Sequence, residues 1–163
     1  METINFTVNH IKVSSEKSFA QVTTAIESMV GKANNLIFQK LIDANASFTE
    51  VENAVKSMVG KHDLMIFTHL ESGKVLSLCG KFKQAKLYII GNPLIANQMF
   101  EEDPAVGLYV PLRLFVYDEY NGKTYITYDQ PSSLLGRFEN PKILRVAEML
   151  DQKLQELVTM AVQ

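Results

Sequence analysis

The chain has almost none of the features that mark secreted or membrane proteins. Its single cysteine, Cys79, cannot form an internal disulfide, which fits a reducing compartment, and its apolar neighbours favour a buried, inert thiol. Residues 1–20 contain no apolar segment of a secretory signal, and no apolar run approaches the roughly 20 residues that span a bilayer. We therefore predict a cytoplasmic protein with no membrane segment.

An excess of charge of either sign is also absent. The 16 Lys and Arg residues nearly balance the 18 Asp and Glu residues, and the formal charge at pH 7 is -2. No global field then attracts the chain to nucleic acid or anionic lipid. One local basic run contains no acid, but its lysines are spread out as on a solvated edge: Lys74, Lys81, Lys83 and Lys86. The sequence disfavours nucleic acid as a partner.

No complete catalytic or metal-binding motif is present. The three histidines, His10, His62 and His69, do not have the spacing of a metal site, although two of them lie on predicted strands that could be neighbours. A Ser-His-Asp arrangement of Ser132 or Ser133 with His69 and Asp129 lacks the nucleophile elbow that would support it. We therefore assign no catalytic residue and no metal ligand, and the sequence names no cofactor.

The composition that remains is ordinary for one soluble globular domain. At 163 residues, with 47% hydrophobic and 21% charged residues, the chain can bury about two thirds of its unfolded surface, and we predict a single domain over residues 1–163. Proline fixes backbone geometry and tyrosine makes directional contacts. Four of the five prolines and all six tyrosines lie between Leu87 and Phe138, so a site is expected in this stretch.

Two segments in the first half of the chain have nearly the same sequence. Ser18–Lys32 reads SFAQVTTAIESMVGK and Ser47–Lys61 reads SFTEVENAVKSMVGK, with nine identities in fifteen positions. Each begins with a capping box, carries an apolar stripe at helical spacing and has a glycine, Gly31 or Gly60, where a helix C′ residue would lie. Both segments predict helices that follow the same start and stop rules, with a partial duplication as the alternative. A further helix is predicted between them, over residues 34–45.

Other segments give signals of the same kind. Runs rich in β-branched or apolar residues predict strands over residues 3–13, 64–70 and 85–90. Asparagine–proline pairs predict helix starts at Asn92 and Asn140, the second opening a long amphipathic helix. Lys74–Cys79 fits a strand or a short helix equally. This order of elements predicts an α+β fold with a mainly antiparallel sheet and the long C-terminal helix packed on it.

Tyr109–Tyr120 and Lys123–Gln130 form the clearest predicted hairpin. Asn121–Gly122 is the strongest short-range signal for a two-residue type I′ turn, and that turn sets the register of the strands. One face of the hairpin then carries Arg113, Phe115, Tyr117, Ile126 and Tyr128. Both faces are largely apolar or aromatic, so both should be covered. Helices can cover one face, and the other needs a loop, a ligand or a second subunit.

Two segments of this region carry a family resemblance, and they read GNPLIANQMFEEDPAVGLYVPLRLFVYDE and YDQPSSLLGRF. They resemble the domain-of-unknown-function family 302, whose members share a TATA-binding-protein-like β-α-β(4)-α fold. The resemblance extends upstream through IFTHLESGKVLSLCGK and the N-terminal strand and helix. It departs at about residues 33–60, where this chain carries an extra helical insertion. The resemblance implies a fold and no activity.

Arg113 is the residue whose chemistry most needs an explanation. It stands alone in an apolar strand, and a buried guanidinium would need a counter-charge. An ion pair with Asp129 or Asp103 is one alternative, and an anion clamp for a carboxylate or phosphate ligand is the other. Asn92 likewise either caps its helix or leaves the first N–H groups of the helix free for an anion.

The candidate binding residues are Arg113, His69, Asn92, Phe115, Tyr117, Tyr128 and Asp129. We expect a non-enzymatic module that binds a ligand, such as a small anion, or that assembles as a homodimer through the hairpin face. The alternative is an enzyme that acts on a small anionic substrate, with Arg113 as the clamp and His69 or Asp129 in proton transfer. That alternative requires these groups to converge on one open cleft.

Overall fold

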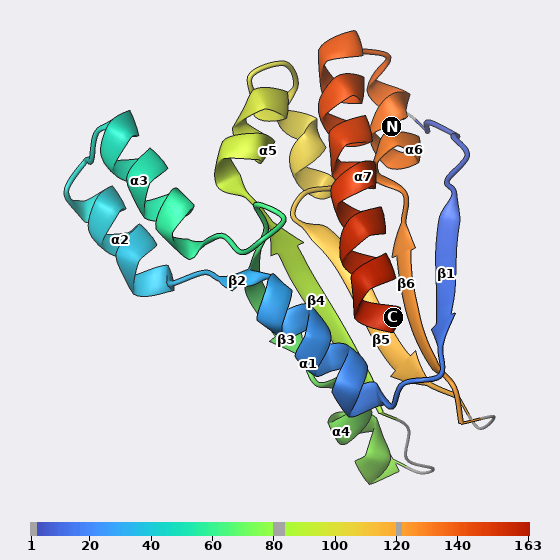
Figure 1. Cartoon of the computed structure of the whole chain (residues 1–163). Helices are drawn as coiled ribbons and strands as arrows, with labels where there is room; N and C mark the ends of the chain where they lie inside the picture. Colours follow the sequence, from blue (N-terminus) through green and yellow to red (C-terminus); the bar gives the residue numbers. More distant parts are fainter. Residues whose placement is uncertain (1–2, 80–83, 120–121) are drawn as a thin grey trace.

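The computed structural model describes residues 3–79, 84–119 and 122–163, which form one sheet with helices packed on it (Figure 1). Six strands follow one another in the order β1-β6-β5-β4-β3-β2. Neighbouring strands are antiparallel except β2 and β3, which are parallel. The strands are β1 (His10–Ser15), β2 (Gly31–Lys32), β3 (Met65–Leu70), β4 (Ala85–Gly91), β5 (Leu112–Asp118) and β6 (Thr124–Asp129). The predicted α+β fold with a mainly antiparallel sheet is confirmed.

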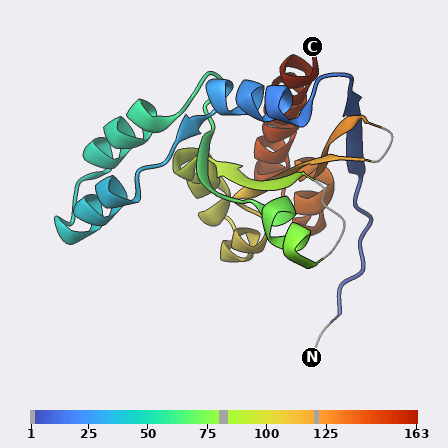
Figure 2. The ribbon, with the colours of Figure 1, turned by 90° about the horizontal axis from the view of Figure 1, so that it is seen from below.

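Helices cover one face of this sheet. α1 and α7 lie on the same side of it, and α5 closes the upper end of the core (Figures 1 and 2). The helices are α1 (Phe19–Met29), α2 (Asn35–Asp43), α3 (Phe48–Met58), α4 (Ser72–Leu76), α5 (Pro93–Phe100), α6 (Pro131–Leu135) and α7 (Pro141–Val162). Short 3-10 turns are η1 (Ser77–Cys79), η2 (Pro104–Leu108) and η3 (Gly136–Phe138).

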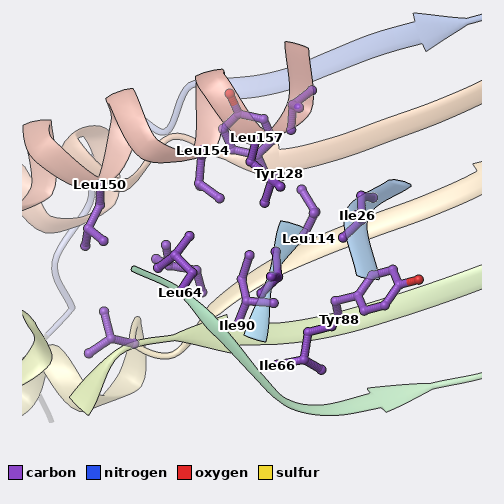
Figure 3. Packing of buried hydrophobic residues seen from close by; sticks show 14 of the residues in the cluster. Ile26, Leu64, Ile66, Tyr88, Ile90, Leu114, Tyr128, Leu150, Leu154 and Leu157 are labelled. Carbon is purple, nitrogen blue, oxygen red and sulfur yellow. The ribbon is translucent and has the colours of Figure 1, made fainter. Parts of the chain in front are cut away.

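α7 is the long C-terminal helix that Asn140 and Pro141 predict. The Asn140 side-chain oxygen accepts a hydrogen bond from the Lys142 backbone N–H at 2.8 Å, and Pro141 occupies the first helical position, where no N–H is needed. The apolar stripe of α7 is buried, and its Leu154 belongs to the same core cluster as Leu114 of β5 (Figure 3). The predicted packing of this helix on the sheet is confirmed.

The two sequence repeats both fold into capped helices. Ser18 and Gln21 form the capping box of α1, and Ser47 and Glu50 form that of α3. The helix predicted between them is α2, which Asn34 caps. α2 and α3 project together from the side of the sheet (Figure 1), and we call this pair the arm. The predicted helical insertion in this part of the chain is confirmed.

The glycines that end the repeats do not have the role that the sequence suggests, because neither has the positive φ of a helix C′ glycine. The chain enters the arm through Gly31 and leaves it through Gly60, and both N–H groups donate to the Leu64 carbonyl, at 3.0 and 2.9 Å. A Cβ on Gly31 would lie 1.8 Å from the Met58 carbonyl oxygen, and a Cβ on Gly60 would lie 2.2 Å from that of Met29. Glycine is required at both positions by this contact between backbones, which we call the backbone crossing.

Some boundaries differ from those predicted. β1 begins at His10 rather than at residue 3, because its partner β6 ends at Asp129 and α6 begins two residues later at Pro131. α6 and η3 have no counterpart among the predicted elements. Lys74–Cys79 is mostly helical, in α4 and η1, and Cys79 is exposed rather than buried because η1 lies at the surface.

The hairpin of β5 and β6 forms, but its turn is not the predicted one. The Gly122 N–H donates to the Glu119 carbonyl at 3.0 Å, and the Glu119 N–H donates to the Lys123 carbonyl at 3.0 Å. Three residues rather than two therefore separate the paired positions, and Gly122 has a φ of 80°. This is the geometry of a turn followed by a left-handed glycine. Asn121 of the predicted turn lies outside the described residues.

The longer turn shifts the strand register by one residue and changes which side chains share a face. Tyr117 lies opposite Tyr125 instead of Ile126. The predicted placement of Ile126 and Tyr128 beside Arg113 is therefore wrong. Both are buried on the helix side of the sheet, where Tyr128 lies near α7 (Figure 3).

Candidate functional site on the open face of the sheet

The candidate site is the face of the sheet that α1 and α7 leave uncovered. Along β5, Leu114 and Val116 are buried under the helices, whereas Phe115 and Tyr117 point to the other side. Residues in register with them on the neighbouring strands complete this surface. We call it the open face, and it consists of His10, Lys12, Ser14, Thr68, Leu70, Ala85, Leu87, Ile89, Arg113, Phe115, Tyr117, Tyr125, Thr127 and Asp129.

Aromatic rings stack in a row across the open face. The ring centroids of Phe115 and Tyr117 are 5.5 Å apart with planes at 24°, and those of Tyr117 and Tyr125 are 5.5 Å apart with planes at 23°. Lys12 lies 3.9 Å from the Tyr125 centroid and donates to Glu119 at 2.9 Å. Hydrogen bonds with Tyr117 and Glu119 raise the pKa of Lys12 above its ordinary value. The row of Phe115, Tyr117 and Tyr125 therefore ends at a fixed cation.

Aliphatic side chains extend this row towards β3. Leu87 and Ile89 of β4 are half-buried, and Leu70 of β3 is 55% exposed. The segment after β3 adds further exposed apolar side chains, which are Val75, Leu76 and Leu78. Soluble monomers seldom leave a large continuous apolar surface uncovered. Two lysines of the basic run, Lys81 and Lys83, lie outside the described residues.

Arg113 is exposed on the open face rather than buried in the sheet. Within residues 3–79, 84–119 and 122–163 its guanidinium has neither a hydrogen bond nor an ion pair. Asp129 binds His10 Nδ1 at 2.8 Å instead, and Asp103 caps η2. The strand alternation that turns Arg113 outward thus removes the need for a structural counter-charge. Arg113 and Asp129 nevertheless line the same small hollow, so both charges are close together at this end of the open face.

The other predicted binding residues lie elsewhere. His69 is opposite Tyr88 in the sheet, and the two rings are 6.2 Å apart on the helix side. Asn92 caps α5 with its side chain. Arg113 and His69 lie on opposite faces of the sheet and do not line a common cleft, so only the form of the enzyme alternative that uses His69 is excluded. The structure brings together Arg113 and Asp129 with the aromatic row, and it separates them from His69, Asn92 and Tyr128.

The model of a protein family described as domain of unknown function DUF302 matches residues 42–161. The chain belongs to this family. The crystal structure of an uncharacterized conserved DUF302 protein from Bacillus stearothermophilus has a similar fold, with a TM-score of 0.65 and 17% identity over 93% of this chain and 97% of that one. No curated protein matches this chain. The resemblance seen in the sequence is therefore confirmed, and the DUF302 description assigns no function.

This DUF302 domain contains a buried lysine, Lys86, whose burial was not predicted from the sequence. Lys86 of β4 is 8% exposed and forms ion pairs with Glu27 of α1 at 2.7 Å and with Glu71 at 3.0 Å. Glu27 also accepts a hydrogen bond from the Tyr88 hydroxyl at 2.7 Å, and His69 lies 3.7 Å from Glu71. We call these residues the Lys86 cluster.

Hydrogen bonds lower the pKa of both carboxyl groups of the Lys86 cluster. Those from Lys74 and Lys86 lower the pKa of Glu71 to about 2. Burial raises the pKa of Glu27, but hydrogen bonds from Lys86 and Tyr88 outweigh it and the net pKa is lowered. Burial, and then the Glu27 carboxylate, raise the pKa of Tyr88. The Lys86 ammonium is held between two carboxylates, so none of these three groups is free to act as a base. The cluster is therefore an ion-pair network that joins α1 to β4.

The sequence did contain a signal for this cluster. Lys86, Tyr88 and Ile90 occupy every second position of β4, so all three side chains point to the helix side of the sheet. Assigning Lys86 to a solvated basic run with Lys74 hid that alternation. In the described part of the DUF302 chain, no group of three His, Cys, Asp or Glu residues is placed to hold a metal ion. No helix there has both the length and the apolar character needed to cross a membrane.

Proposed function

We propose that this DUF302 chain is a non-enzymatic binding module that forms a homodimer through the open face. The observation that carries the proposal is the uncovered apolar surface formed by the aromatic row and the aliphatic residues of β3 and β4. In the described residues α1 and α7 cover the opposite face only (Figure 2). Pairing two such faces removes aromatic and aliphatic surface from water, which is the dominant favourable term in association.

The charges on the open face support a second copy as the partner. A two-fold interface places the same surface on both subunits, so it must be complementary to itself. The open face carries charges of both signs, and Arg113, which has no ion-pair partner among the described residues, lies beside Asp129 at one end. A two-fold axis can set each arginine against an acid of the other copy. Mixed signs of this kind favour self-association over a partner of uniform charge.

Light scattering on a size-exclusion column tests the dimer. The unmodified chain is expected to elute at twice its 18.4 kDa mass. Phe115→Lys, which places a charge in the aromatic row, is expected to weaken the dimer by at least about 30-fold, the effect of losing one interface hot spot. Because Phe115 is half-buried on the uncovered face, the variant should still fold, and its thermal unfolding checks this.

Leu36→Lys is the matched control for this experiment. Leu36 is 74% exposed on the arm, away from the open face, so the same change there should leave the mass unchanged. A mass of 18.4 kDa for the unmodified chain across a wide concentration range would refute the homodimer. A Phe115→Lys protein that remains fully dimeric would refute the open face as the interface.

Arg113 supports a second, smaller proposal on the same face. A guanidinium without a partner among the described residues can hold a carboxylate or phosphate in a bidentate geometry. A small anionic ligand is therefore proposed to bind beside the aromatic row.

A cytoplasmic location and a TATA-binding-protein-like topology stay predictions.

A further inference from the structure

An apolar cavity lies at the end of β4 where α5 begins. Its volume is about 210 Å3, and side chains from β3, α5, α7 and the residue before β5 line it: Phe67, Pro93, Ala96, Met99, Pro111 and Leu150. Leu150 of α7 also belongs to the main core cluster (Figure 3). Phe100 and Pro111 of the lining are exposed, so the cavity opens to solvent on one side. Sites for small molecules are typically concave, mostly apolar hollows of this kind.

The cavity offers few hydrogen-bonding groups to an occupant. Among the described lining residues Asn92 alone has a polar amide side chain, and each of its two polar atoms already makes one hydrogen bond. Its Oδ1 accepts from the Leu94 N–H at 2.9 Å, and its Nδ2 donates to the Asp63 carbonyl at 2.9 Å. A charged or strongly polar molecule would lose its hydration here without compensation. The lining thus selects an uncharged, apolar occupant.

The volume and the lining of the cavity restrict the possible occupant further. An engineered apolar cavity of about 150 Å3 stays dry and binds benzene. A cavity of about 210 Å3 has room for one such ring with a short alkyl substituent. Phe67 and Met99 supply an aromatic ring and a thioether sulfur, and both make favourable contacts with an aromatic ring.

We propose that this cavity is a binding site for a small uncharged molecule with a single aromatic ring. The site is separate from the open face and does not depend on the proposed homodimer. It also extends to the arm, because Phe67 and Pro93 line the groove beneath α2 as well. Phe38 of α2 stacks on Phe67 with ring centroids 6.5 Å apart, so the arm supports one wall of the site.

Thermal unfolding of the full chain with toluene tests the site. At a free concentration about five times its Kd, toluene is expected to raise the Tm by about 2–4 °C, since a ligand that binds only the folded state stabilises it by mass action. Benzoate, which has a similar ring but carries a charge, is expected to cause no shift. A toluene shift no larger than the benzoate shift would overturn the proposal.

Filling the cavity separates this site from binding elsewhere. Ala96→Leu places a larger side chain in the cavity from α5, and leucine is a good helix former, so the fold should persist while the toluene shift disappears. Ala20→Leu, at an exposed position of α1, is the matched control and should keep the full shift. An Ala96→Leu protein that toluene stabilises as much as the native chain would overturn the proposal.

A spectroscopic measurement on the unmodified chain gives a result even if the Ala96→Leu variant does not fold. Toluene is expected to change the methyl chemical shifts of Ile95, Met99 and Leu150, which line the cavity, before those of other residues. Changes confined to methyl groups of the open face, such as those of Leu87 and Ile89, would overturn the cavity as the site.

Discussion

Replacing Gly31 with alanine is expected to lower the free energy of unfolding by about 4 kcal/mol or more, an effect that few single substitutions reach. A Cβ at this position would lie 1.8 Å from the Met58 carbonyl oxygen and 2.7 Å from the Gly60 nitrogen. Both neighbours are backbone atoms, so no side chain can rotate away to make room. Because Gly31 and Gly60 donate to the same Leu64 carbonyl, the substitution must open the backbone crossing.

Urea unfolding of matched glycine variants checks this expectation. Gly60→Ala should be strongly destabilised as well, since its Cβ would lie 2.2 Å from the Met29 carbonyl oxygen. Gly136→Ala is the control, because a Cβ there meets no atom of the described residues within 4 Å and φ is -59°. That control should be neutral or stabilised by about 0.4–1 kcal/mol through the unfolded state. If Gly31→Ala and Gly136→Ala proved equally stable, the backbone crossing could not be as tight as its geometry implies.

The same glycines show where sequence reasoning succeeds and where it ends. Helix starts depend on residues within one turn, so Ser18 and Ser47 identify the capping boxes of α1 and α3 from the sequence alone. The reason for glycine at positions 31 and 60 lies in contacts with residues about 30 positions away. A local rule, that a helix ends at a glycine with positive φ, predicted the same role for both glycines. That prediction was wrong, since neither has a positive φ. The repeat was informative because both of its copies end at one junction.

The candidate site was predictable in its composition and not in its geometry. Arg113, Phe115 and Tyr117 alternate along one strand, so their common face follows from the sequence. The turn decides which residues of β6 share this face. Because the turn is one residue longer than predicted, Tyr125 lies on the open face and Tyr128 lies on the helix side. The Lys86 cluster was out of reach for a different reason, since Glu27 lies 59 positions before Lys86.

Replacing Lys86 with methionine is the second prediction with a large effect. Removing one partner of a buried ion pair leaves an uncompensated charge and typically costs about 3–5 kcal/mol. Glu27 and Glu71 are each 32% exposed, so water can stabilise their carboxylates in part. We therefore expect Lys86→Met to lower the free energy of unfolding by about 2–3 kcal/mol, below the fully buried case. Lys56→Met is the matched control, because Lys56 pairs with Glu52 on an exposed helix face and should cost at most about 0.5 kcal/mol.

The pH dependence of this difference identifies its electrostatic cause. Folding lowers the pKa values of Glu27 and Glu71. Their ion pairs therefore stabilise the native state fully at pH values above the ordinary carboxyl pKa of 4.5. That stability is lost as the pH falls through the folded pKa, which for Glu71 is about 2. The free energies of unfolding of the native chain and Lys86→Met should therefore differ most near pH 7 and converge as the pH falls below 4.5. A difference that stays constant from pH 7 to pH 3 would instead assign the effect of Lys86 to the packing of its aliphatic chain between α1 and β4.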